Sequence, residues 1–117
     1  MPLVLVYGVP KDTTDDRILA YKSAVQKAIA DIPAMRITPK QVSVMPMSCI
    51  GPECGEIHIE VTYNKKWRRT RKIRKLIMET VKNTTEEYFK GQLCLVECWG
   101  RRFNGKKEGF AWFAKND

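Results

Sequence analysis

Hydrophobic residues recur along this chain in two patterns, and each pattern predicts a different kind of element. Mostly apolar runs over 3–9, 41–47, 56–63 and 92–99 predict four strands. Apolar positions spaced by three and four residues follow the first and third of these runs and predict two helices. The order is therefore strand–helix–strand, repeated once.

Local signals place the ends of both helices. Thr13 or Thr14 can cap the first helix, and Pro33 ends it. The second helix is predicted over 67–89, and Gly91 closes it. The inner stripe of the first helix is Ile18, Tyr21, Val25, Ile29 and Ile32. The stripe of the second is Thr70, Ile73, Ile77, Val81, Thr84 and Tyr88.

The repeated order predicts an α/β fold of duplicated β-α-β units. We expect a single domain over 1–117, with half-repeats at about 1–50 and 56–117. Right-handed crossovers make each half a parallel strand pair with its helix on one face. The result is a four-stranded sheet with two helices on one face, plus a C-terminal hairpin over 101–113. The other face needs cover, which association of subunits would supply.

Composition sets limits on location. The chain is 44% hydrophobic and 29% charged, which allows a buried core. It has no apolar run as long as the roughly 18 residues that a membrane-spanning helix needs. The first strand is too short for the core of a signal peptide and lacks a basic leader. We therefore expect a cytoplasmic protein.

The four cysteines do not have the spacing of a zinc site. Cys94 and Cys98 are four residues apart on a predicted strand, about 13 Å, which is too far to share a metal. We expect free thiols, no metal and no cofactor. A disulfide between Cys49 and Cys54 fits the loop between two strands, but a reducing compartment disfavours it.

The positive charge is concentrated in one segment. The net charge is +8, and residues 64–75 include eight basic side chains and no acidic one, so the rest of the chain is neutral. Lys65, Lys66 and Arg68 fall at the start of the second helix, where cations oppose the helix macrodipole. A bound anion would relieve this repulsion. A solvated basic face, or pairing with acidic groups of a neighbouring subunit, explains the segment equally well.

Pro2 is the candidate catalytic residue. Methionine is usually removed when the second residue is small, which leaves Pro2 with a free secondary amine at the start of a strand. Such an amine can act as a general base if its surroundings lower its pKa below the usual α-amino value of about 7.7–8.0. Proton-transfer chemistry requires a base of this kind.

A proline that opens the first of two β-α-β units resembles the tautomerase superfamily. That family includes macrophage migration inhibitory factor, 4-oxalocrotonate tautomerase, malonate semialdehyde decarboxylase and the chloroacrylic acid dehalogenases. The likeness covers nearly the whole chain in element order. At the residue level it rests on Pro2 and on Gly109-Phe110, placed where the inhibitory-factor branch has a glycine and an aromatic that lines the site. That branch carries Ser-Ile-Gly where this chain has Val61-Thr62-Tyr63-Asn64, so the branch stays open.

The resemblance implies an isomerase, mostly trimeric in this family, with sites between neighbouring subunits. Pro2 would move a proton between carbon and oxygen of a small 2-keto acid or its enol. In the dehalogenase and decarboxylase branches the proline is cationic instead, and arginines hold the carboxylate. Both reactions remain alternatives for this chain.

The resemblance also implies how the substrate carboxylate is held. The decarboxylase and dehalogenase branches place arginines just after the third strand, near Lys65, Lys66 and Arg68. The inhibitory-factor branch uses a lysine between the first helix and second strand, where Arg36 and Lys40 stand. Arg36 or Lys40 could also be a charged loop residue with no role in binding.

Four other residues have a functional and an ordinary interpretation. Tyr63 could donate a hydrogen bond to an enolate, or simply pack at a strand end. Glu97, if buried, could act as an acid or base or position a water; on an outer face it is unremarkable. Phe110 could form a pocket wall or belong to the core. His58 should face away from Ile57 and Ile59, toward solvent or a subunit interface.

A function of a different class is nucleic-acid or anion binding by the second helix. Arg71, Lys72, Arg74 and Lys75 give one face of it a high positive charge, and Trp67 could stack on a base. Against this, the first and third strands lack the paired aromatics that RNA-binding sheets use. The sequence therefore favours the tautomerase interpretation.

Overall fold

The computed structural model describes residues 2–50, 54–64 and 71–103. Their strands are β1 (Leu3–Val9), β2 (Ser43–Ser48), β3 (Glu56–Asn64) and β4 (Leu95–Phe103). Their helices are α1 (Asp15–Ala30) and α2 (Arg71–Tyr88), with two short 3-10 helices, η1 (Pro33–Met35) and η2 (Pro39–Gln41), between α1 and β2. Within these ranges, no helix has both the length and the apolar character needed to cross a membrane.

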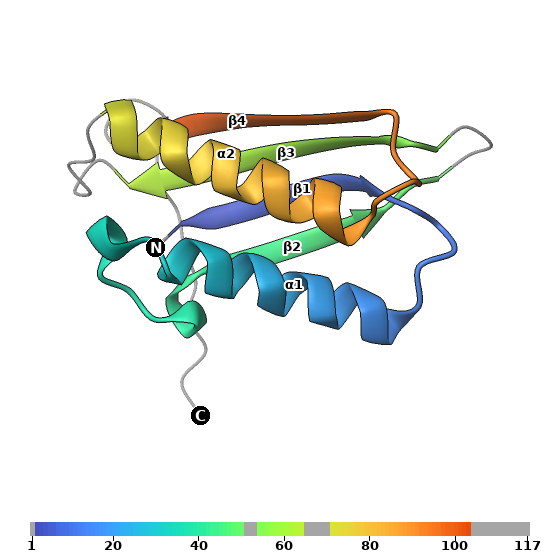
Figure 1. Cartoon of the computed structure of the whole chain (residues 1–117), viewed down its shortest axis with the longest axis horizontal. Helices are drawn as coiled ribbons and strands as arrows, with labels where there is room; N and C mark the ends of the chain where they lie inside the picture. The colour runs from blue at the N-terminus through green and yellow to red at the C-terminus, as the bar shows by residue number, and fades with distance from the viewer. Residues whose placement is uncertain (1, 51–53, 65–70, 104–117) are drawn as a thin grey trace.

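The four strands form one sheet in the order β2-β1-β3-β4 (Figure 1). β1 is parallel to β2, and β3 is parallel to β4, whereas the two central strands are antiparallel. α1 connects the first pair, α2 connects the second, and both helices lie on the same face of the sheet. The predicted α/β fold, with two helices on one side of four strands, is confirmed.

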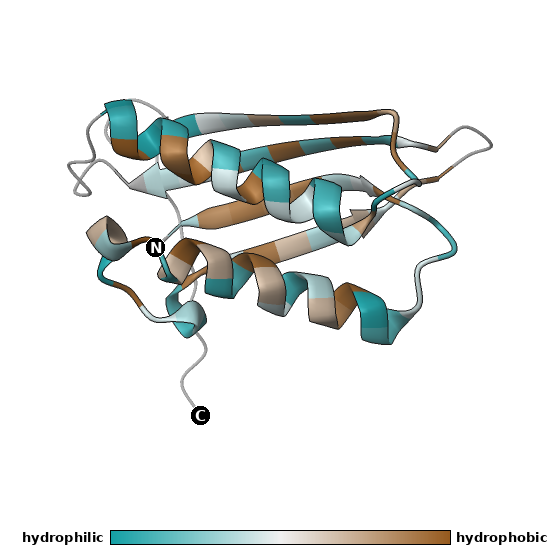
Figure 2. Cartoon of the chain, viewed as in Figure 1, coloured by the Kyte–Doolittle hydropathy of each residue, from teal (hydrophilic) through white to brown (hydrophobic). Residues whose placement is uncertain are grey.

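The core lies between this face and the helices. Alternate residues of the central strands point into it, so that Val4, Val6, Ile57 and Ile59 are fully buried. Hydrophobic positions accordingly mark the central strands and the inner sides of both helices in Figure 2. α1 packs through the predicted stripe, and the Thr14 side chain caps it by accepting a hydrogen bond from the backbone N–H of its third residue. The buried members of that stripe are Tyr21, Val25, Ile29 and Ile32.

The stripe of α2 differs from the prediction at its C-terminal end. Ile77 and Val81 are buried as expected, but the next inward residues are Thr85 and Phe89 rather than Thr84 and Tyr88. Steps of four residues therefore continue along the helix, where the prediction switched to a step of three. The hydroxyls of Thr85 and Tyr21 are 2.7 Å apart, so this step also gives the buried threonine a polar partner.

Two strand boundaries were also wrong. β2 begins at Ser43 and not at residue 41, because Gln41 is the last residue of η2. β4 begins three residues later than predicted and continues through Phe103, so the first arm of the expected hairpin is part of β4. The Asn104-Gly105 turn and the return arm lie outside the described residues.

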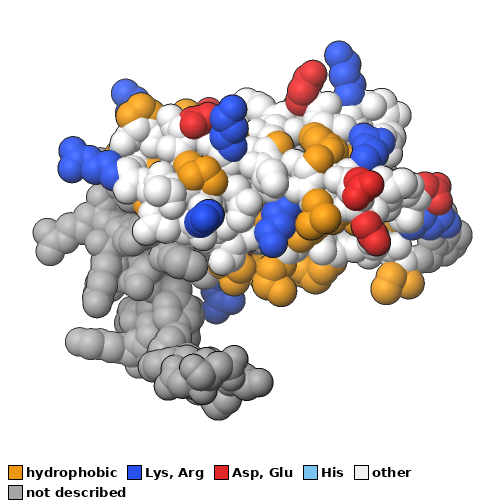
Figure 3. Space-filling model, turned by 90° about the horizontal axis from the view of Figure 1, so that it is seen from below, with side chains coloured by type: hydrophobic (Ala, Val, Ile, Leu, Met, Phe, Trp, Pro, Cys, Tyr) orange, Lys and Arg blue, Asp and Glu red, His pale blue; other side chains and the backbone are white. Residues whose placement is uncertain are grey.

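The second face of the sheet is not covered by a helix. Tyr7, Met45, Met47 and Trp99 all lie on this face and are 37–55% exposed. Viewed from the side of α1 and β2, hydrophobic side chains gather at one edge of the surface (Figure 3). The apolar side chains on the second face could be covered by another subunit.

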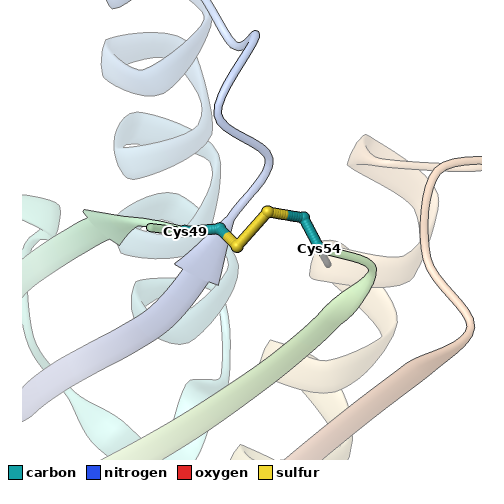
Figure 4. The surroundings of a disulfide bond; sticks show 2 residues. All are labelled: Cys49 and Cys54. Carbon is teal, nitrogen blue, oxygen red and sulfur yellow. A yellow bond between two sulfur atoms is a disulfide. The ribbon is translucent and has the colours of Figure 1, made fainter. Parts of the chain in front are cut away.

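Cys49 and Cys54 form a disulfide (Figure 4), which corrects the expectation of free thiols. Cys49 follows β2 and Cys54 precedes β3, and these strands flank β1 in the sheet. The bond therefore spans the end of β1, where the backbone N–H of Cys49 also donates to the carbonyl of Val9. The prediction rested on the redox state of a compartment, whereas strand order brings the two sulfurs together. Cys94 and Cys98 are free thiols, as expected.

Candidate active site

Pro2 is held at the end of the sheet where β1 begins. Pro2 is buried, and its carbonyl oxygen accepts a hydrogen bond of 3.1 Å from the backbone N–H of Ser43. The parallel register continues from this point, with Leu3 opposite Ser43 and Val4 opposite Val44. The backbone of Pro2 is therefore fixed by the first step of the β1–β2 ladder, and an amine on it would have a defined position.

Tyr63 lies beside Pro2 on the adjacent strand. Leu3 pairs with Thr62 in the antiparallel register of β1 and β3, so the next residues outward are Pro2 and Tyr63. Both belong to the side of the sheet that the helices cover, because strand residues alternate. The half-buried Tyr63 ring also fits against β4: a Cβ on Gly100 would lie only 3.2 Å from Tyr63 Cε1. The structure thus supports packing for Tyr63 and leaves it near the candidate base.

Arg36 and Lys40 lie in the connection that leads from α1 to the Pro2 end of β2. Both are exposed, and neither forms an ion pair within the described part of the chain. Arg36 follows η1 with φ 50° and ψ 44°, a left-handed conformation that is uncommon for a residue with a side chain. Lys40 is in η2, three residues before the Ser43 that contacts Pro2. The connection that leads to the Pro2 end of β2 therefore carries two exposed cations.

Lys65, Lys66, Arg68 and Phe110 lie outside the described residues. The elements that flank the first three in sequence are the end of β3 and the start of α2, and both are at the Pro2 end of the sheet (Figure 1). Their assignment to the substrate carboxylate stays a prediction, as does the pocket wall assigned to Phe110.

Glu97 is not brought together with Pro2. It lies in the middle of β4 on the open face, opposite His58, which in turn pairs with Tyr7 of β1. Tyr7 is five residues along β1 from Pro2, a separation of roughly 16 Å. The Glu97 side chain is 57% exposed, so it needs no buried partner. Its ordinary interpretation, an outer-face carboxylate, is the one the structure supports.

His58 is the centre of a polar cluster that the sequence did not reveal. Its Nδ1 is 3.6 Å from Glu97 Oε2, and its Nε2 is 3.5 Å from Glu56 Oε2. The ring is also 6.3 Å from that of Trp99. The Glu56–His58 spacing alone places those two on one face of a strand, but the partners on β4 depend on register. Its orientation away from Ile57 and Ile59 is as predicted.

Solved structures resemble this architecture closely in shape and weakly in sequence. No protein-family model matches the chain, and no curated protein matches it. One similar structure is Pt0534 inactivated by 2-oxo-3-pentynoate, with TM-score 0.72, 14% identity, and coverage of 93% of this chain and 92% of that one. This chain has the tautomerase superfamily fold.

Two further structures show the range of proteins with this fold. Wild-type fused 4-OT, solved as a symmetric trimer, has TM-score 0.69 and 13% identity, covering 93% of this chain and 91% of that chain. A 5-carboxymethyl-2-hydroxymuconate isomerase from Deinococcus radiodurans R1 has TM-score 0.70 and 12% identity, covering 98% and 90%. Sequence identities this low establish a shared fold and leave the reaction of this tautomerase-fold chain to be argued from its own residues.

Proposed function

We propose that this chain is a tautomerase in which the Pro2 amine transfers a proton between carbon and oxygen of a small 2-keto acid or its enol. The supporting observation is the placement of Pro2: buried, immediately before β1, and fixed through its carbonyl to Ser43. Burial favours the neutral form of an amine, because the cation loses its hydration. A neutral secondary amine has the lone pair that a general base requires.

Removal of Met1 is a condition of this mechanism. While Met1 is attached, the Pro2 nitrogen is part of an amide and has no basic lone pair. Once Met1 is removed, the substrate α-carbon would lie next to the free nitrogen. Proximity and orientation would then replace a bimolecular encounter with a positioned proton transfer.

The substrate carboxylate would be held by cations at the same end of the sheet. Arg36 and Lys40 are exposed there without an ion-pair partner in the described ranges, and Lys65, Lys66 and Arg68 are further candidates from the sequence. Cations next to the developing enolate would stabilise its negative charge and lower the barrier. We therefore expect small, anionic keto acids to be better substrates than neutral ketones.

The open face of the sheet suggests how the site is completed. Tyr7, Met45 and Trp99 expose apolar surface that an isolated subunit would leave in water. Together with the trimeric assembly of the similar fused 4-OT structure, this supports self-association, which we propose to be a homotrimer. A neighbouring subunit could then add side chains to the Pro2 end.

The first experiment combines an intact mass with an activity assay. We expect the native protein to lack Met1 and to catalyse ketonisation of phenylpyruvate or hydroxyphenylpyruvate. Pro2→Ala should lower kcat/KM by about 10²-fold or more, the usual contribution of a positioned general base. Pro10→Ala, at the opposite end of β1, is the matched control and should retain activity. Retained Met1, or activity indifferent to Pro2→Ala, would rule out the proposed mechanism.

Two readouts distinguish a neutral proline from a cationic one. With a neutral base, kcat/KM should rise with pH and level off once the amine is deprotonated. A decline with rising pH would instead indicate the protonated proline of the dehalogenase and decarboxylase alternatives. 2-Oxo-3-pentynoate, the inactivator in the similar Pt0534 structure, provides the second readout. A neutral Pro2 amine should add to it, and peptide mapping should place the added mass on Pro2.

A further inference from the structure

Three of the four cysteines meet at the end of the sheet opposite Pro2. Cys49, Cys54 and Cys94 line one cavity of about 470 Å³, together with Tyr7, Gly8 and His58. Cys49 and Cys54 are joined as a disulfide, while Cys94 is a free and exposed thiol. A free thiol and a disulfide therefore line the same cavity.

Backbone contacts fix Cys94 next to the disulfide. Its N–H donates to the carbonyl of Gly55 at 2.8 Å, and its thiol Sγ lies 3.4 Å from the same oxygen. Gly55 directly follows Cys54 in the chain. Glu56 pairs with Leu95, so extending the parallel register back by one residue puts Cys94 beside Gly55 and diagonal to Cys54. Cys54 is therefore one residue, about 3.8 Å along the Cα trace, from the residue that Cys94 contacts.

Gly55, which follows Cys54, also lies beside the Cys94 thiol. It has φ +137°, which residues with a Cβ rarely adopt, and a Cβ there would lie 3.5 Å from Cys94 Sγ. With glycine at this position, residue 55 itself places no side chain beside the free thiol.

Cys98 serves as an internal contrast. It lies four residues further along β4, on the helix-covered side, with its Sγ 3.8 Å from Met78 Sδ. Burial raises the pKa of the Cys98 thiol to about 12, so it stays protonated and unreactive near neutral pH. The two free thiols of this chain are therefore placed for different purposes: one packs in the core, and the other lines a cavity with a disulfide.

We propose that Cys94 and the Cys49–Cys54 pair form a thiol–disulfide exchange site. The Cys94 thiolate attacks Cys54 Sγ, the Cys49–Cys54 bond breaks, and Cys49 leaves as a thiolate. Cys94 gives its proton to water before the attack, and Cys49 is released as the thiolate in its place, so the step is redox-neutral, with one disulfide before and after. The released Cys49 thiolate can then attack a small external disulfide, forming a mixed disulfide and expelling one external thiolate.

The test maps the disulfides of the whole chain. Purified protein is incubated with glutathione disulfide at mildly alkaline pH, quenched with acid, and digested without reduction for mass spectrometry. We expect a Cys54–Cys94 linked peptide together with glutathione on Cys49. Cys98→Ser should give the same products, whereas Cys94→Ser should retain Cys49–Cys54 and carry no glutathione on Cys49. Detection of only the Cys49–Cys54 pairing in wild type would overturn the proposal.

A second variant tests whether Cys54 and Cys94 can form a disulfide when the competing Cys49–Cys54 bond cannot form. In Cys49→Ser, only Cys54 and Cys94 remain near one another, so oxidation by glutathione disulfide should join them. Separate glutathione adducts that persist on Cys54 and Cys94 would also overturn the proposal. Circular dichroism of each variant confirms that it is folded before its disulfides are mapped. Activity toward keto acids is not used as a readout, so this test is independent of the proposed role of Pro2.

Discussion

The two faces of the sheet differ sharply although the same strands form both. In β3, Ile57 and Ile59 are fully buried against the helices, whereas the side chain of His58 between them is 38% exposed. The helix-covered face is almost entirely aliphatic, and the open face mixes aromatic, methionine, histidine and carboxylate side chains. This difference indicates that one face holds the fold together, while the other is available for contacts with a further subunit.

The largest expected effect comes from a cavity on the covered face. Ile59→Ala should lower the free energy of unfolding by about 2–5 kcal/mol, because it removes buried methyl groups that the packed helices cannot replace. His58→Ala is the matched control on the neighbouring position and should cost about 0.5 kcal/mol or less. Urea denaturation measures both. Equal losses would mean that the two faces contribute similarly to stability.

A second prediction concerns the buried tyrosine of the covered face. Burial raises the pKa of Tyr21 from 10.0 to about 12 in the folded state. Between these values the unfolded chain loses the tyrosine proton while the folded chain keeps it, so stability must fall as pH rises. The loss is roughly 2–3 kcal/mol from pH 10 to pH 12.

Substitution isolates this contribution. Tyr21→Phe removes the titrating group, so the free energy of unfolding should fall less between pH 10 and pH 12. At neutral pH the variant should be less stable by about 1 kcal/mol, because the contact with Thr85 is lost. Tyr88→Phe, a partly exposed neighbour, is the control. If the free energy of unfolding of Tyr21→Phe fell with pH above 10 as steeply as that of the wild type, other groups, such as Cys98, would account for the loss.

Substitutions on the open face should change the stability of the subunit least. They should instead weaken its association with other subunits. Trp99→Lys and Met45→Lys place charges where an apolar partner surface is expected, so they should lower the assembly mass measured by light scattering. Their effect on subunit stability should stay within about 0.5 kcal/mol. Leu76→Lys, an exposed apolar residue on α2, is the control and should leave the mass unchanged. A wild-type monomer would contradict the trimer proposal.

The pattern of hydrophobic residues predicted the first strand and the buried face of α1, but only part of the buried face of α2. The first strand was predicted with its observed bounds, and the predicted stripe of α1 faces the core, with Tyr21, Val25 and Ile29 buried. Thr85 and Phe89 were missed because Thr84 and Tyr88 fit helical spacing equally well. The choice between them depends on where α1 places Tyr21, which no local pattern contains.

The candidate site divides in the same way. Pro2 was identified from its position in the sequence, and strand pairing then put Tyr63 beside it. The two interpretations of Glu97 stayed open in the sequence, because a strand pattern gives alternation but not the partner strand or the face that is covered. The Cys49–Cys54 bond was disfavoured on the expected redox state of the compartment, and their spacing does not show that β1 lies between the two strands that flank them.

The sequence by itself determined the element order, the apolar stripes and the terminal proline, because these depend on the spacing of residues close together in the chain. Tertiary structure alone decided which face stays open, which carboxylates meet His58, and which sulfurs share a cavity. The His58–Glu97 and Gly55–Cys94 contacts each join residues 39 positions apart, and they exist only after β3 and β4 have paired in parallel register. Local spacing can set the direction of a side chain, but its partner depends on strand order and register.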